Sequence, residues 1–138
     1  MSIVQTQTTS FKKQLYQGIH DLSTDTIYIA LYTAAADLNA DTTVYSSTNE
    51  VVATGYTAGG KVLTGVAISS DGYTAYVNWA NVSWTSALTA RCALIYNVTQ
   101  GNKSVAVLDF GSDKTSTTTF TITMPSNTST TALIRSSN

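Results

Sequence analysis

The spacing of apolar residues near the N-terminus predicts a single helix. Phe11, Leu15, Ile19 and Leu22 are four, four and three residues apart, so they form one stripe along an α-helix over residues 11–22. The residues before it, 1–10, show no such pattern. We interpret them as an N-terminal arm that extends from the folded domain.

Beyond residue 26 the pattern changes to one that indicates strands. Residues 26–32 alternate with a period of two, and residues 119–124 alternate strictly. Two apolar runs, 89–99 and 104–111, are separated by a short polar turn and predict neighbouring strands of a buried sheet. An Asp-Gly pair at 71–72 predicts a β-hairpin. Together with several shorter apolar runs, these segments predict an all-β fold: a β-sandwich of about eight to ten short strands with the one helix. We expect it to form a single domain over residues 11–138.

The amino-acid composition limits the kinds of molecule that the protein is expected to bind. The chain has 138 residues, of which 11% are charged, and a formal net charge of −1. Threonine and serine are its two commonest residue types. Such a surface does not attract nucleic acid or an anionic membrane electrostatically, and no apolar run approaches the length of a membrane helix. We therefore expect neither nucleic acid nor membrane as a partner.

The few residues able to carry chemistry are dispersed along the chain. His20 adjoins Asp21, but neighbouring residues on a helix point in different directions and do not make a catalytic dyad. Cys92 is the only cysteine and lies in an apolar strand, which favours a buried thiol and a reducing compartment. The N-terminus also lacks the basic start and apolar core of a signal peptide. We predict no catalytic residue and no cofactor.

Two binding functions have to be weighed, namely calcium binding and the stacking of sugar rings. Asp37, Asn39 and Asp41 have the every-second-residue spacing of calcium loops, but the glycine and closing glutamate of an EF-hand are missing, so no metal site is predicted. Trp79, Trp84 and the eight tyrosines would suit a platform that stacks sugar rings. Tryptophan at strand ends more often fills the core, however.

Distinctive blocks of sequence follow one another from about residue 11 to residue 135. They include GYTAGG and VLDFG, and they lie at 11–22, 25–34, 48–51, 55–60, 89–91, 93–97 and 107–111. In this order the blocks resemble a family of small virion structural proteins of tailed bacteriophages. Cys92 departs from the glycine or alanine expected at its position, which is a small change.

The resemblance implies a non-enzymatic virion protein, made in the host cytoplasm and located on the outer capsid surface. We expect a capsid decoration, or cement, protein that binds the major capsid protein and stabilises the shell. It is expected to be a homo-oligomer, specifically a trimer. A tail- or neck-associated structural component and a receptor- or glycan-binding virion module are the alternatives.

Three polar segments of low charge are poorly explained by a single-domain core: the arm, residues 34–50 and the tail after Pro125. Long loops in compact domains are usually functional or ordered by partners. We therefore predict that the interface residues come from these segments: Ile3, Val4, Gln5, Asp37, Asn39, Asp41, Tyr45 and Asn127.

Overall fold

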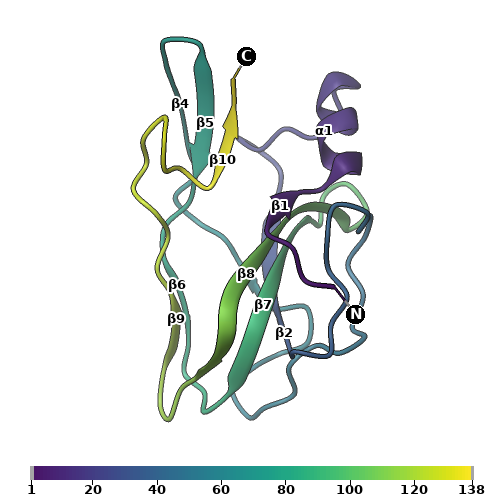
Figure 1. The fold of residues 1–138 in the computed structure, drawn as a ribbon, viewed down its shortest axis with the longest axis vertical. Coiled ribbons are helices and arrows are strands. Elements are labelled where there is room, and N and C mark those ends of the chain that lie inside the picture. Colours follow the sequence, from purple (N-terminus) through teal and green to yellow (C-terminus); the bar gives the residue numbers. More distant parts are fainter. Residues whose placement is uncertain (1, 138) are drawn as a thin grey trace.

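The computed structural model describes residues 2–137, and these form ten strands and one short helix (Figure 1). The predicted all-β fold is confirmed. In chain order the elements are β1 (Thr6–Gln7), α1 (Thr9–Tyr16), β2 (Ile27–Tyr32), β3 (Lys61–Val62), β4 (Ala67–Asp71), β5 (Thr74–Asn78), β6 (Val82–Trp84), β7 (Thr89–Asn97), β8 (Lys103–Thr115), β9 (Phe120–Ile122) and β10 (Ile134–Ser136).

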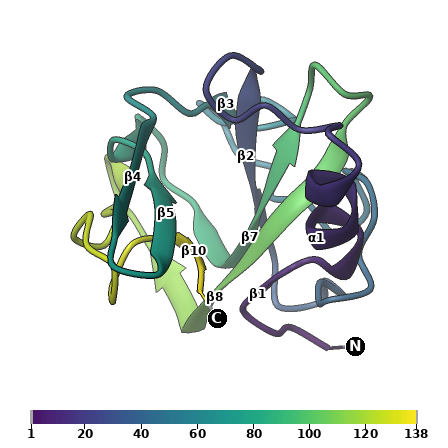
Figure 2. The same cartoon turned by 90° about the horizontal axis from the view of Figure 1, so that it is seen from above.

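The strands form two layers around one main core. The larger sheet has the order β1-β8-β7-β2-β3, and two smaller sheets, β10-β5-β4 and β6-β9, lie opposite it (Figures 1 and 2). Ile29 and Ile95 of the large sheet belong to the same buried cluster as Trp84, Phe120 and Ile134 of the smaller sheets. The molecule is thus a sandwich whose second layer is divided in two.

The centre of the large sheet is the strand pair that the two long apolar runs predict. β7 and β8 pair antiparallel, from Asn97 opposite Lys103 to Thr89 opposite Thr115. The turn between them places Asn102 at φ 63°, a left-handed conformation that asparagine tolerates better than most residues. β2 pairs along the other edge of β7 without a register shift.

Both faces of β2 are buried, each by a different part of the chain. Ile27, Ile29 and Leu31 face the main core. The alternate residues, including Tyr32, belong to a second cluster that contains Leu38 from the 34–50 loop. The 34–50 loop therefore covers the outer face of the large sheet, and its own outer side faces solvent.

The helix is shorter than the predicted 11–22. α1 ends at Tyr16, and Gly18 follows at φ 69°, the left-handed conformation that glycine adopts at helix ends. Two backbone hydrogen bonds satisfy the last carbonyls in the pattern of a Schellman motif: Gly18 N–H to Leu15 O (3.1 Å) and Ile19 N–H to Gln14 O (3.0 Å). Gly18 therefore ends the helix.

The apolar stripe predicted for the helix is accordingly divided. Phe11 is fully buried against the core, and Leu22 is also buried although it lies beyond the helix. Leu15 is 40% exposed and Tyr16 is 94% exposed. The stripe is therefore core at Phe11 but lies at the surface by Leu15, where the pattern predicts a core position.

The prediction of an extended N-terminal arm over 1–10 is wrong for the described residues. Ile3 forms a parallel bridge with Leu38, and β1 pairs antiparallel with Ala106 and Val107 of β8. Thr8 is fully buried, and its side chain accepts a hydrogen bond from the Phe11 N–H as the N-cap of α1. The segment is an edge strand and a helix cap of the domain.

Candidate functional site

His20 is buried in a network of neutral hydrogen bonds. Its Nε2 lies 2.7 Å from Gln14 Oε1, and its Nδ1 lies 3.0 Å from Asn97 Nδ2. Because the Asn97 amide group also donates to Asp25, this geometry requires a ring that donates from Nε2 and accepts at Nδ1. Burial lowers the pKa of His20, partly offset by the negative charge of Asp25. The ring tethers the residues after α1 to β7.

We expect the stability of the protein to fall as the pH is lowered from 7 to 5. His20 has an ordinary pKa of 6.5 when unfolded and a lower pKa when folded, so in this range the unfolded chain binds more protons. The variant His20→Gln, which has no group that titrates there, should show a flatter dependence of melting temperature on pH. An unchanged slope in this variant would contradict the assignment.

Asp109 and Asp25 titrate below that window. The pKa of Asp109 lies below its ordinary value of 3.8, because the Gly111 N–H and the Arg91 side chain donate to it. The pKa of Asp25 is also lowered: burial opposes ionisation, but hydrogen bonds from Asn97 and the Asp21 N–H outweigh it. The ionised forms of these two carboxyl groups stabilise the folded state above about pH 4, and this stabilisation is lost as the pH falls further.

Cys92 is fully buried in β7. Burial raises the pKa of its thiol to about 11, so it stays protonated near neutral pH. It packs in the second cluster beside Tyr32 and Val107. Its surroundings are those of a small apolar side chain.

The Asp37–Asp41 segment uses its polar atoms in local turns. Asp37 Oδ1 accepts hydrogen bonds from the Ser2 N–H (3.0 Å) and from Asn39 Nδ2 (3.1 Å), and Asn39 Oδ1 accepts from the Asp41 N–H (2.9 Å). Among residues 2–137, His, Cys, Asp and Glu side chains form no group of three suited to a metal ion. The alternating polar residues are therefore explained by their hydrogen bonds, which stabilise local turns.

Glu50 organises a group of buried and half-buried tyrosines that the sequence pattern does not reveal. Its carboxylate accepts hydrogen bonds from Tyr45 (2.6 Å), Tyr56 (2.5 Å) and the Gly59 N–H (2.8 Å). Tyr45 also stacks on Tyr96, with ring centroids 4.7 Å apart. Burial raises the pKa of Tyr96 to about 12 and raises the pKa of Tyr56 further, so these hydroxyls remain donors. The cluster attaches the long loop to β2.

The two tryptophans do not form an exposed platform. Trp79 is 5% exposed and Trp84 is 3% exposed, and both belong to the main core. Trp84 packs between Tyr56 and Phe120 at centroid distances of 5.9 and 6.3 Å. Neither indole presents a free face for stacking on a sugar.

The predicted interface residues are brought together only in part. Ile3, Val4, Asp37, Asn39 and Asp41 lie in one region, where the N-terminal segment pairs with the loop. The side chain of Val4 is 49% exposed. The side chains of the other three have different surroundings: Gln5 accepts a hydrogen bond from the Asp109 N–H, Tyr45 is half-buried against Glu50, and Asn127 is exposed in the segment between β9 and β10.

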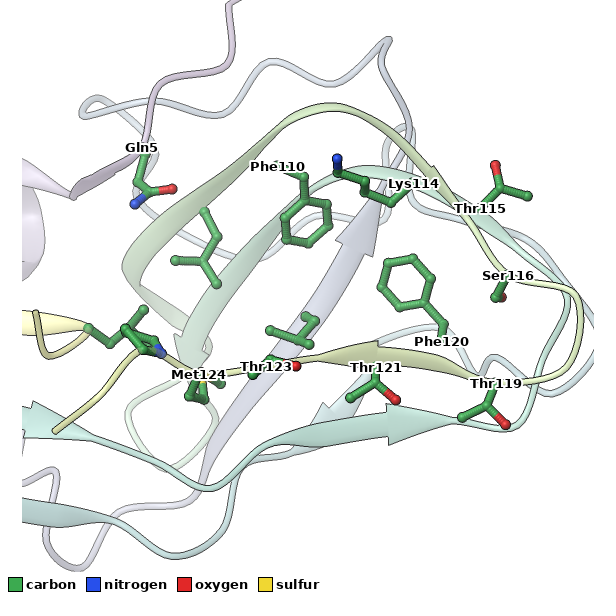
Figure 3. A pocket seen from close by; sticks show the side chains of 14 residues that line it. Gln5, Phe110, Lys114, Thr115, Ser116, Thr119, Phe120, Thr121, Thr123 and Met124 are labelled. Atoms are coloured by element: carbon green, nitrogen blue, oxygen red, sulfur yellow. The ribbon is translucent and has the colours of Figure 1, made fainter.

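A groove between β8 and β9 has a volume of about 670 Å³. Its apolar lining is formed by Leu108, Phe110, Phe120, Ile122, Met124 and Leu133. Figure 3 shows the rings of Phe110 and Phe120 entering it from opposite strands, and their centroids are 6.2 Å apart. Lys114 is the only charged residue in the lining. We call this hollow the β8–β9 groove.

The groove exists because β8 and β9 are consecutive strands that do not pair. β8 beyond Val107 pairs only with β7, and β9 pairs only with β6. Between Asp109 and Lys114, β8 bulges: the residues 110–113 face a single β7 residue, Arg91. The bulge directs β8 away from β9. β9 therefore leaves one edge of its backbone without a partner strand beside the groove, whereas on β8 the Asp109 and Gly111 N–H groups already donate to the Gln5 and Asp109 side chains.

No family model, curated protein or solved structure matches the chain. Within residues 2–137 no helix is long and apolar enough to span a membrane. The function therefore has to be inferred from the sequence blocks and the geometry of the surface.

Proposed function

We propose that the protein is a non-enzymatic structural component of a tailed-bacteriophage virion. In this proposal it is a capsid decoration protein, made in the host cytoplasm, that binds the major capsid protein on the outer surface of the head as a homo-oligomer. Such a role calls for a rigid domain that binds its neighbours through extended surfaces rather than through a reactive cleft.

The observation that carries the proposal is the contrast between the buried ionisable groups and the open strand edges. His20 and Glu50 are occupied in internal hydrogen bonds that hold loops to the sheet. The β8–β9 groove, by contrast, is lined by apolar and uncharged polar side chains with one lysine, and it is bordered by the free edge of β9. Unpaired strand edges are sites for adding a strand from another chain. This arrangement suits assembly better than catalysis.

The proposal is tested by the copy number and location of the chain in purified virions. Quantitative mass spectrometry should find it at a copy number comparable to that of the major capsid protein, and antibody labelling should place it on the head. Virions lacking the protein should rupture at a lower temperature. A copy number equal to that of a single ring, with labelling at the neck or tail, would instead identify the tail component. Absence from virions would overturn both.

A further inference from the structure

We propose that the β8–β9 groove receives strand β4 of a second copy of this chain, an inference that rests on the proposed role in a homo-oligomeric assembly. The donor strand would add to the free edge of β9. The sheet β10-β5-β4 of one copy would then continue into β9-β6 of the next.

The acceptor edge is short, with three residues in β9, but it lacks the charges, prolines and bulges that often protect a sheet edge. β9 and the residue before it, Thr119, carry no charge, no proline and no bulge. Pro125 comes only after the apolar part of the strand. Proteins commonly block exposed edges with lysine, proline or bulges. β8, on the other side of the groove, has both a bulge and charged side chains, so β9 is the edge that is open to pairing.

The donor edge carries one charge, Asp71, and has no other feature that protects it. β4 is the outer strand of its sheet and pairs with β5 in regular register over five residues, without a bulge. It has no lysine or proline, and nearly all of it is exposed. Ile68 is 52% exposed, and Tyr73 at the end of the hairpin is 90% exposed. This hairpin projects from one end of the molecule (Figure 1).

Charge complementarity selects β4 as the occupant. Asp71 is the only charged residue of the β4–β5 hairpin, and Lys114 is the only charged residue that lines the groove. Asp71 is exposed, and its side chain accepts one hydrogen bond, from Ser129. With Asp71 beside Lys114, β4 would run antiparallel to β9, and Ile68 would lie against the apolar lining. One ion pair would thus set both register and direction.

The contact has to form between copies. The β4–β5 hairpin and the connection between β8 and β9 lie at opposite ends of the long axis (Figure 1). A chain therefore cannot place its hairpin in its own groove. Because donor and acceptor are different surfaces, the contact is heterologous, and repetition of it closes a ring when the rotation per copy allows.

Charge reversal tests the proposal on the full-length protein. Analytical ultracentrifugation of the wild type should show a mass above 14.6 kDa that rises with concentration. Asp71→Lys and Lys114→Glu should each raise the apparent Kd by about tenfold or more, and the double variant should restore association. Lys13→Glu, a reversal of an exposed charge on α1, should change nothing. All variants should keep the wild-type melting temperature, because both side chains are exposed.

A cross-linking experiment locates the contact independently. Asp71→Cys protein mixed with Lys114→Cys protein should form a disulfide-linked pair under mild oxidation. Asp71→Cys mixed with wild type should not, because Cys92 is fully buried. A wild type that stays monomeric, or an oligomer that neither reversal weakens, would overturn the inference. Copy number and location in virions are separate readouts, so failure here would leave the proposed function standing.

Discussion

Replacing Gly60 with alanine should destabilise the protein by at least about 3 kcal/mol, a large share of the stability of a small domain. Gly60 has φ 84°, which favours glycine, and it lies directly before β3. A Cβ atom there would lie 1.8 Å from the Ile29 carbonyl oxygen and 2.7 Å from the Ala30 Cα. These atoms belong to the backbone of β2, so relief requires β2 and β3 to separate.

Gly72→Ala is the matched control for this prediction. Gly72 also has a left-handed conformation, with φ 59°, but apart from its chain neighbours no atom lies within 4 Å of the position that a Cβ would take there. Its substitution should cost only about 1 kcal/mol, the penalty for the backbone conformation alone. Urea denaturation of the two variants distinguishes the cost of the steric overlap at position 60 from the cost of the left-handed backbone conformation. Equal destabilisation would show that β2 and β3 are not packed as closely as these distances indicate.

The parts of the fold that the sequence predicts well are those set by local pattern. The runs at 89–99 and 104–111 are long, apolar and joined by a short turn, so their pairing as β7 and β8 follows from neighbouring residues. The Asp-Gly pair at 71–72 likewise predicts the β4–β5 hairpin. In both cases the partner strand is only a few residues away in the chain.

The errors arise where distant segments decide the outcome. β1 is short and polar, and its only strand partner, β8, is about a hundred residues further along the chain, so the local pattern predicts an arm. The predicted end of the helix is wrong for a different reason. The apolar spacing continues through Leu22, but the left-handed Gly18 ends α1 and the chain beyond it follows a new path.

The β8–β9 groove cannot be predicted from the sequence because it forms where two consecutive strands, β8 and β9, do not pair with each other. A hydrophobic pattern marks Phe110 and Phe120 as core residues, and both do contribute to the core. Nothing in that pattern shows that the 110–113 bulge separates β8 from β9. The one local signal is Gly111, at φ 83°, in the middle of a long strand. A glycine inside a strand often marks a bulge.

Glu50→Ala should destabilise the protein by about 3–5 kcal/mol and lower its melting temperature by roughly 10 °C or more. Glu50 is only 7% exposed, and its carboxylate accepts hydrogen bonds from Tyr45, Tyr56 and the Gly59 N–H. Alanine would leave all three donors without their acceptor. The cost of an unsatisfied buried donor exceeds the net value of the hydrogen bond it has lost.

Tyr45→Phe is the control, since it removes one donor and leaves the carboxylate with two. It should cost about 1 kcal/mol, measured by the same thermal and urea unfolding. In Glu50→Ala, hydrogen exchange should also accelerate at the Gly59 and Leu31 amides, because Leu31 N–H donates to the Tyr56 hydroxyl that Glu50 orients. A Glu50→Ala variant within about 1 kcal/mol of wild type would contradict the assignment of this carboxylate as the group that attaches the 34–50 loop to β2.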